Sequence, residues 1–318
     1  MKLFRHLLLV EWSGLAAAIL LGAAALSFIA PNFLTEFNLY VMLRSLSVGL
    51  LVALAQMITL GVGQINIAVG ALGGLTAIIF GAAMELYGFP VLLAIPVALG
   101  IGALGGLING LLTVRTGVNA FIITLATASA FTGINFGITG SIPFYKMPAA
   151  LVGFGDRHWG ALPYLLVAPL LVALLLGQFF SRTAPGRQLL AFGGNPQAAE
   201  LSGISRERVV VSAHVLSGLL AAAAAVLAVA QLGSAQPTIG ADWLLLSFAA
   251  PIIGGAALTG GHISVLGTMF AVLLLGLIQN GMVLAKVDPY WVQFVLGALI
   301  LVAVGLNRWR AVNSGRLE

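Results

Sequence analysis

Long apolar stretches follow one another along almost the whole chain. One α-helix needs about 20 apolar residues to cross the hydrocarbon core of a bilayer. Stretches of about this length occur at 14–30, 41–60, 65–84, 90–113, 119–138, 161–180, 209–231, 242–258, 263–285 and 290–307. A membrane β-barrel would instead show short segments of alternating polarity. The pattern therefore predicts an all-α, polytopic membrane protein with about ten transmembrane helices, built as one domain over residues 1–318.

Composition and missing motifs narrow the function. Charged residues make up only 7% of the chain, against about a quarter in soluble domains, which excludes a soluble enzyme and a disordered chain. There is no cysteine, so thiolate catalysis and thiolate metal sites are excluded. None of the three lysines follows a glycine, as a phosphate-binding loop requires, and the four histidines form no metal-ligand pattern. We expect no catalytic residue, no metal and no cofactor.

The distribution of charge predicts the orientation. Cytoplasmic loops of membrane proteins are rich in lysine and arginine, so the net charge of +5 does not indicate nucleic-acid binding. With the N-terminus inside, the cytoplasmic set is Lys2, Arg5, Arg115, Arg182, Arg187, Arg206, Arg208, Arg308, Arg310 and Arg316. Lys146, Arg157 and Lys286 fall outside with Glu36, Glu85, Asp156, Asp242 and Asp288, and Arg44 lies at an outer span end. An even number of spans with both termini in the cytoplasm fits this division.

Polar residues within the predicted spans are amides and hydroxyls rather than charges. A proton-coupled carrier normally keeps an intramembrane carboxylate, and none is placed near a span centre here. Sodium coupling stays open, because backbone carbonyls can bind that ion. Each amide can serve as an interhelical hydrogen bond. As a group, they favour a path for a neutral, polyhydroxylated solute.

Two passages carry specific patterns. GVGQINIAVGALGGL at 61–75 places polar residues at the start of a glycine-rich helix, where glycines let neighbouring helices approach and amides can line a cavity. PGRQLLAFGGNPQAAELSGISRERV at 185–209 lies in the longest cytoplasmic loop, about 181–208. There Asn195 can cap a short helix with Pro196 in its first turn, and Gly203 can end it. The pattern indicates either an exposed docking helix or a solvated loop.

The chain resembles the permease subunit of ABC importers of the ribose-type monosaccharide family. The resemblance is densest in GRQLLAFGGNPQAAELSGI, LSGLLAAAAAVLAVAQLGSAQPTIG, IIGGAALTGGHISVLGT and GLIQNGMVLAKVDPYWVQ, and GQINIAVGALGGL resembles the family's hallmark. One position departs, because the family usually has aspartate where this chain has Asn66. That change keeps the shape and removes a charge, which puts the substrate or the gating role of the position in doubt.

The resemblance implies a type II importer fold, a place in the inner membrane of a bacterium and a set of partners. These partners are an ABC ATPase, often with two fused nucleotide-binding domains, a periplasmic sugar-binding protein, a second permease copy, identical or different, and membrane lipid. The loop at 186–204 would be the coupling element, with Ala198, Ala199, Leu201 and Gly203 presenting docking surface and Arg187 and Glu200 making polar contacts. Gly186, Gly193, Gly194 and Asn195 complete that element. From polarity within the matching segments, we predict a translocation path that includes Gln64, Asn66, Asn119, Phe121, Thr124 and Asn280.

Three alternatives stay open. The first is a permease of the same superfamily for nucleosides or branched-chain amino acids. The second is a secondary carrier or channel, which would transport without any ATPase. The third is a membrane-embedded enzyme, for which the sequence offers no catalytic constellation.

Overall fold

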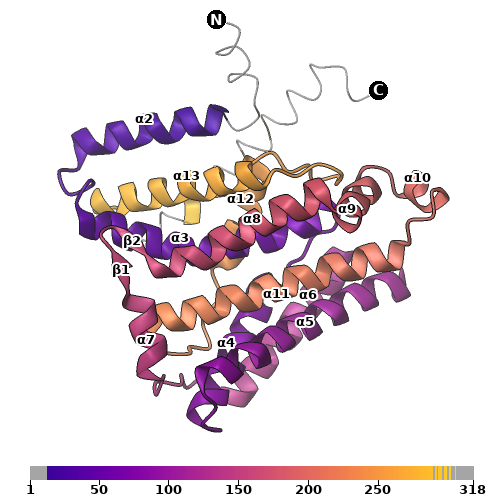
Figure 1. Cartoon of the computed structure of the whole chain (residues 1–318), viewed down its shortest axis with the longest axis horizontal. Coiled ribbons are helices and arrows are strands. Elements are labelled where there is room, and N and C mark those ends of the chain that lie inside the picture. Colours follow the sequence, from indigo (N-terminus) through magenta and orange to yellow (C-terminus); the bar gives the residue numbers. More distant parts are fainter. Residues whose placement is uncertain are drawn as a thin grey trace, which may run out of the picture.

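The computed structural model describes residues 13–288 and, beyond them, residues 291, 293–295, 297, 298, 301 and 305. Within this part the chain is almost entirely helical (Figure 1). Six helical stretches of the described part are long and apolar enough to cross a membrane. They are α3 (Glu36–Gly61), α5 (Val91–Thr116), α6 (Ala120–Thr139), η1 (Tyr164–Leu166) joined to α8 (Val167–Arg182), α11 (Arg206–Leu232) and α13 (Val265–Leu284).

Three shorter apolar helices accompany them: α2 (Ser13–Ile29), α4 (Val69–Glu85) and α12 (Trp243–Ile253). The prediction of an all-α polytopic membrane protein is therefore confirmed, and nine of the ten predicted stretches each overlap one of these helices. The tenth, 290–307, falls mostly outside the described residues.

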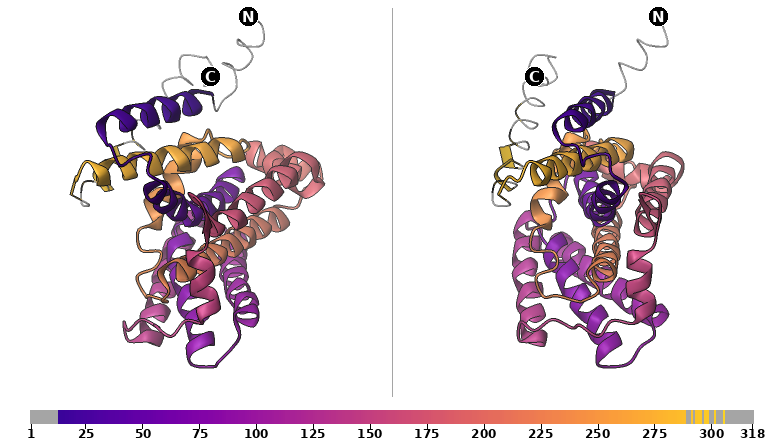
Figure 2. Two further views of the ribbon diagram at one scale, coloured as in Figure 1. Left: turned by 60° about the vertical axis from the view of Figure 1, so that its left-hand side comes forward. Right: turned by 90° about the vertical axis from the view of Figure 1, so that its left-hand side faces the viewer.

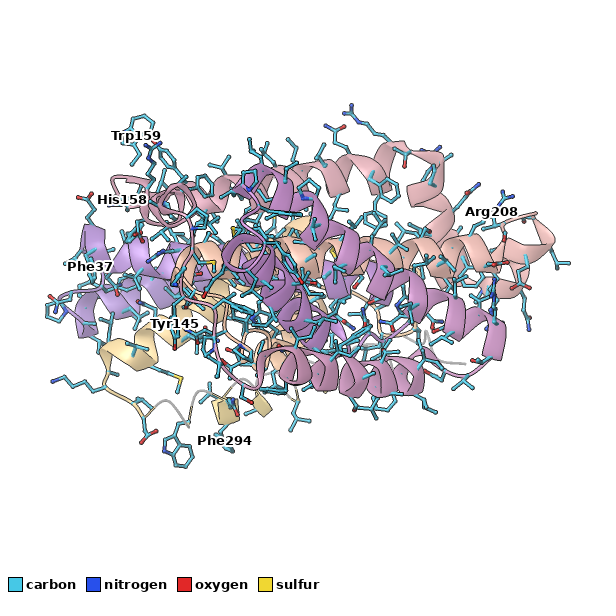
Figure 3. All side chains as sticks on the ribbon, turned by 90° about the horizontal axis from the view of Figure 1, so that it is seen from below. Phe37, Tyr145, His158, Trp159, Arg208 and Phe294 are labelled. Carbon is cyan, nitrogen blue, oxygen red and sulfur yellow. The ribbon has the colours of Figure 1, made fainter. Side chains whose placement is uncertain are left out.

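The long helices run side by side and give the molecule two opposite ends. The α7 end holds α7 (Ala149–Asp156) and the antiparallel strands β1 (His158–Trp159) and β2 (Leu162–Pro163). The α10 end holds α9 (Ala184–Gly194) and α10 (Pro196–Leu201). Figure 3 shows Phe37, His158 and Trp159 at the first end and Arg208 at the second. Neither α7 nor the hairpin was predicted, because the 139–160 stretch reads as a proline-containing loop.

Helix α11 lies at the centre of the bundle, packed against α5, α3 and α4. Its contact with α5 is antiparallel and depends on glycine: a Cβ added at Gly102 would meet the backbone of Gly218, and one added at Gly110 would lie 2.7 Å from the Cα of Val211. Small residues let helix backbones approach this closely in a membrane. The pairing brings the end of α5, with Arg115, beside the start of α11 at the α10 end.

Helix α2 lies apart from this core and packs along α13, as the two views in Figure 2 show. The contact is again built on glycine, with Gly22 facing Leu277 and Gly281 facing Leu26. The first helix therefore reaches the rest of the bundle mainly through α13.

Two of the predicted spans are helical over only part of their length. The 65–84 span becomes helical only at Val69, and residues 62–68 before α4 contain turns and irregular backbone. The 242–258 span is helical over just 11 residues of α12, and it is preceded by the non-helical residues 234–242. Irregular backbone at membrane depth is tolerated only where it is buried in protein or lines a water-filled cavity. We call these stretches the 62–68 segment and the 234–242 segment.

Candidate functional site

The 62–68 segment is held by side chains from three helices. On α3, the Gln56 amide donates to the Asn66 carbonyl (2.8 Å) and accepts from the Asn66 N–H (3.2 Å) in the orientation that satisfies both groups. On α11, the Ser217 hydroxyl accepts from the Asn66 side chain (3.0 Å). On α6, the Thr124 hydroxyl accepts from the Ile67 N–H (3.0 Å). These bonds replace the helical bonds that the irregular backbone gives up.

Asn66 and Thr124 are therefore buried parts of an interhelical network. The Asn66 oxygen also accepts from the Ala68 N–H (3.0 Å), which fixes the turn into α4. Satisfying buried backbone groups is obligatory in the apolar interior, where each orphan costs about 1–3 kcal/mol. Both side chains therefore serve to fix the backbone of this segment.

The 234–242 segment lies in a groove that the glycines of α4 create. Going along the segment, Ala235 contacts Gly81, Ile239 contacts Gly74 and Gly240 contacts Gly70. A Cβ at Gly74 would lie 2.5 Å from the Ile239 carbonyl oxygen, so no larger residue fits there without movement. These glycines were predicted to let another helix approach. They instead make room for the irregular backbone of the 234–242 segment.

Two further contacts secure this segment. The Asn135 amide on α6 donates to the Pro237 carbonyl (2.9 Å). Phe144 and Ala235 exchange backbone hydrogen bonds of 2.9 and 2.8 Å, which ties the segment to the α7 end. One side of the segment is thus packed, while its other side faces a pocket.

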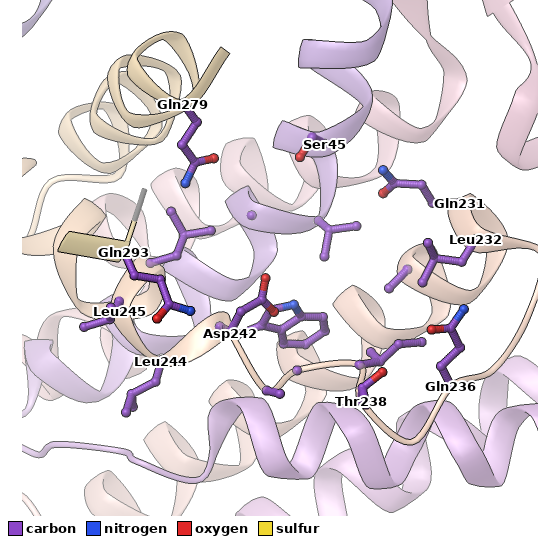
Figure 4. Close-up of a pocket in the computed structure, with 18 residues that line it drawn as sticks. Ser45, Gln231, Leu232, Gln236, Thr238, Asp242, Leu244, Leu245, Gln279 and Gln293 are labelled. Atoms are coloured by element: carbon purple, nitrogen blue, oxygen red, sulfur yellow. The ribbon is translucent and has the colours of Figure 1, made fainter. Parts of the chain in front are cut away.

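That pocket, of about 660 Å³, lies between the 234–242 segment, α3, α11, α12 and α13 (Figure 4). Its size falls within the range of about 300–1,000 Å³ typical of ligand pockets. The polar lining consists of Ser45, Gln231, Gln236, Thr238, Asp242, Gln279 and Gln293. Trp243 and several leucines complete the wall. Amides and hydroxyls beside an aromatic ring suit a neutral solute with many hydroxyl groups, because both donors and acceptors are available.

The pocket lies deep between the two ends of the bundle. At 1.5 Å per helical residue, Ser45 is about 14 Å along α3 from Glu36 at the α7 end, and Gly70 is about 22 Å along α4 from Glu85. Asp242 is two residues from Gly240, which contacts Gly70. Asp242, which the charge distribution groups with the outer acidic residues, thus lines the pocket, because the chain after α11 turns back into the bundle before α12 begins.

Arg44 precedes the pocket residue Ser45 on α3 and is bonded to α11 and α7. Its guanidinium donates to the carbonyl of Gln231 (2.7 Å) and forms an ion pair with Asp156 of α7 (2.7 Å). Its cation also lies 5.8 Å from the centre of the Tyr40 ring. The charge at this span end is thus paired.

The six residues predicted for the path are not among those lining this pocket. Asn280 exchanges side-chain hydrogen bonds with Asn38 of α3 (3.0 and 2.9 Å), and Asn119 caps α6 by accepting from the Phe121 N–H (2.9 Å). Phe121 is exposed and Gln64 is partly buried. A path along these side chains in the assembled transporter stays a prediction.

The α10 end presents a second candidate site. Asn195 caps α10 by accepting from the Ala198 N–H (3.0 Å), Pro196 starts the helix and Gly203 follows it with a φ of 82°. The predicted short helix is confirmed. Helix α9 was missed, although Thr183, which accepts from the Gly186 N–H (3.1 Å), and Pro185 are a helix-start signal.

The surface of this end differs from the predicted one at one position. Leu201 is 91% exposed, and Arg187, Ala198 and Glu200 are exposed too. Ala199 is only 5% exposed and belongs to the main core, so the prediction that it presents docking surface is wrong. The Asn195 cap sets the phase of α10, and that phase turns Ala199 inward and Leu201 outward.

A cluster of glycines joins this end to the pocket walls. The Gly261 N–H donates to the Gly61 carbonyl at the end of α3 (2.9 Å). Added Cβ atoms at Gly193 and Gly260 would lie 2.6 Å from the backbone nitrogens of Gly261 and Gly63. We call Gly61, Gly63, Gly193, Gly194, Gly260 and Gly261 the glycine junction. It brings the backbones of α3, α9 and the α12–α13 loop into direct contact.

Comparison with known proteins identifies the family. Residues 38–304 match the family model described as branched-chain amino acid transport system / permease component. The chain belongs to this permease family. It is accordingly a transport component rather than an enzyme. The resemblance stated from the sequence is confirmed.

The alignments with curated relatives cover nearly the whole chain. The fructose import permease protein FrcC of Rhizobium meliloti is 32% identical, covering 92% of this chain and 85% of that protein. The ribose import permease protein RbsC of Bacillus subtilis is 34% identical, covering 89% and 88%. The autoinducer 2 import system permease protein LsrD of Photorhabdus luminescens is 33% identical, covering 92% and 90%. No solved structure matches the permease.

Sequence reasoning missed most of the pocket. Gln279 lies within a predicted span, yet the sequence pattern favours its neighbour Asn280 for the path. Gln231, Gln236 and Asp242 read as parts of a span end and an outer loop. The run SAQPTIGAD between two apolar stretches, with polar residues around Pro237 and Gly240, is the signal that could have indicated a re-entering segment.

Proposed function

We propose that this permease is the membrane subunit of an ATP-driven importer for a monosaccharide or a related polyol. The supporting observation is the deep pocket lined by glutamines and hydroxyls within an apolar bundle. Its chemistry fits a neutral polyhydroxylated solute. The relatives named as ribose and fructose import permeases point the same way.

The proposed topology has ten spans in a type II importer-like arrangement, with 290–307 as the tenth. The α10 end faces the cytoplasm and the α7 end faces outside. This assignment is supported by the gathering of Arg115, Arg182, Arg187, Arg206 and Arg208 at the α10 end, since basic residues are enriched in cytoplasmic loops. Both termini are then cytoplasmic.

The proposed partners bind at the two ends of the bundle. An ABC ATPase, with two fused nucleotide-binding domains, docks on α9 and α10 from the cytoplasm, with Leu201 as its apolar anchor. A periplasmic sugar-binding protein delivers the solute at the α7 end. A second permease copy, identical or different, completes the path, as the resemblance to the family implies.

The glycine junction is the proposed route by which a movement of the ATPase reaches the walls of the pocket. Because no side chain separates the backbones, a shift of α9 pushes directly on the end of α3 and on the α12–α13 loop. Helix α3 carries Ser45, and α12 and α13 carry Trp243 and Gln279. The pocket walls therefore move relative to each other when the docked ATPase closes, which is a two-state switch between packed arrangements.

Transport by the reconstituted complex tests the proposal. The full chain is placed in proteoliposomes with the ATPase and the binding protein of the same transport system, and uptake of radiolabelled ribose and fructose is measured. We expect accumulation of one of them only with MgATP. Accumulation against a gradient by the permease alone would contradict the proposal in favour of a secondary carrier.

A pair of variants tests the docking surface. Leu201→Asp is expected to abolish copurification of the ATPase, because a charge replaces an exposed apolar anchor. Leu162→Asp, an exposed leucine of β2 at the opposite end, is expected to leave copurification unchanged. Retention of the ATPase by Leu201→Asp would move the docking site away from α10.

The alternative within the same family is a permease for branched-chain amino acids, after which the family model is described. An amino acid carries both an ammonium and a carboxylate, and the described pocket lining offers a single charged side chain, Asp242. The neutral solute is therefore the better fit.

A further inference from the structure

Asp242 is the charged side chain of the pocket. It lies at the start of α12, exposed to the cavity, and Figure 4 shows it beside Gln293, with Ser45 and Gln279 across the cavity. Its side chain caps no N–H of α12. A charged residue at this depth in a membrane protein normally faces a water-filled, functional cavity.

No positive charge compensates Asp242 within the described lining. That lining contains no lysine, arginine or histidine, and the nearby guanidinium of Arg44 is paired with Asp156. The remaining polar groups are neutral amides and hydroxyls. The N-terminal end of the α12 dipole, where Asp242 lies, stabilises a negative charge there.

The negative charge of Asp242 has a strong electrostatic effect inside this pocket. Low-dielectric walls focus the field of a single charge into the cavity, and the same effect makes rings of acidic residues select cations in channels. Neutral solutes are not repelled, and their hydroxyl groups can donate hydrogen bonds to the carboxylate.

We propose that Asp242 is a specificity-determining residue that makes the pocket repel anions. The path would then admit neutral or cationic solutes and reject negatively charged ones such as sugar phosphates and sugar acids. This inference rests on the proposed function in that the pocket belongs to the path.

The absence of cysteine from the chain permits a direct measurement of the field. Ser45→Cys places a thiol in the pocket wall of the full-length protein, and Leu201→Cys places one on the exposed α10. Each protein is modified with a cationic and an anionic methanethiosulfonate reagent of similar size. The ratio of the two rate constants, divided by the ratio for 2-mercaptoethanol, reports the local potential.

In the Ser45→Cys protein we expect the cationic reagent to be favoured at least about tenfold. At an effective dielectric constant of about 20, a unit charge across a pocket attracts the cationic reagent and repels the anionic one, and Coulomb's law makes each effect about tenfold or more. Adding Asp242→Asn, which keeps the shape, should bring the ratio for the pocket thiol close to that of the free thiol. Asp242→Ser, a good helix cap, serves as a second variant. Glu36→Gln, which removes an exposed carboxylate from the start of α3, should leave the ratio for the pocket thiol unchanged.

Two results would overturn the proposal. One is a ratio for the pocket thiol that stays the same after Asp242→Asn and after Asp242→Ser. The other is the failure of both reagents to reach the pocket thiol of Ser45→Cys while the surface thiol of Leu201→Cys is modified normally. Because the measurement needs no ATPase and no transported solute, its failure is distinct from failure of the proposed importer function, which the reconstituted uptake assay decides.

Discussion

The 62–68 and 234–242 segments are both irregular stretches of chain within the bundle, and each leads directly into one of the shorter apolar helices, α4 or α12. They differ in what their polar groups contact. In the 62–68 segment, Asn66 is buried and bonded to α3 and α11. In the 234–242 segment, the backbone is packed against α4 while Gln236, Thr238 and Asp242 line the pocket.

The difference shows how a polar, glycine-containing break in a membrane helix can serve two purposes. A break whose side chains satisfy their own and neighbouring backbone groups is structural. A break that leaves side-chain donors and acceptors facing a cavity is available to a solute. The arrangement resembles the discontinuous helices of other transporters, where unwound backbone surrounds the substrate.

The largest expected effect comes from filling the groove that holds the second segment. Gly74→Leu places a side chain at a position where even an added Cβ would lie 2.5 Å from the Ile239 carbonyl oxygen and 3.2 Å from the Asn135 amide nitrogen. We expect destabilisation of at least about 3 kcal/mol, because backbone rather than a flexible side chain must move. The measurement is thermal unfolding of the purified protein in detergent.

Gly133→Leu on α6 is the control, because a Cβ there meets no atom within 4 Å. Its melting temperature should match that of the wild type. Equal stability of Gly74→Leu and Gly133→Leu would mean that the 234–242 segment is not seated in the α4 groove.

The next prediction compares the loss of stability at two glutamines that lie within membrane helices. Gln56→Leu removes the clamp on Asn66 and leaves a buried N–H and a carbonyl without their partner, which should cost about 2–3 kcal/mol of stability. Gln279→Leu changes a pocket side chain and should leave the melting temperature within about 1 °C of the wild type. A similar loss of stability in both would remove the distinction between the two segments.

Much of the fold was predictable from composition and pattern. Apolar stretches place the helices, and the short helix α10 follows from Asn195, Pro196 and Gly203. The interruptions were not predictable in this way, because a window of average hydrophobicity treats apolar turns and apolar helix alike. Residues 65–68 and 254–258 are mostly apolar or glycine and therefore resemble helix, although the chain is irregular there.

The candidate site was predictable in its chemistry but not in its residues. Amides within spans indicate hydrogen bonding in the membrane, yet the partner decides the role, and the partner is set by tertiary packing. Asn66 is hydrogen-bonded to Gln56 and Ser217, which are 10 and 151 residues away in the chain. Ala199 and Leu201 illustrate the same limit, since only the orientation of α10 against the core decides which of them is exposed.

The smallest effect distinguishes adjacent residues of α13. Gln279 lines the pocket, whereas Asn280 is bonded to Asn38 of α3. Gln279→Ala should lower the initial rate of sugar uptake about fivefold in the reconstituted importer, since one hydrogen bond to a solute hydroxyl contributes about 1 kcal/mol, and should leave the melting temperature unchanged. Asn280→Ala should do the reverse, with a loss of about 1 kcal/mol in stability and an uptake rate within twofold of the wild type. If Asn280→Ala slowed uptake more than Gln279→Ala at equal amounts of folded protein, the path would pass Asn280, as the sequence pattern predicted. The register of a single helix, which separates these two neighbours by about 100°, therefore decides between the two paths.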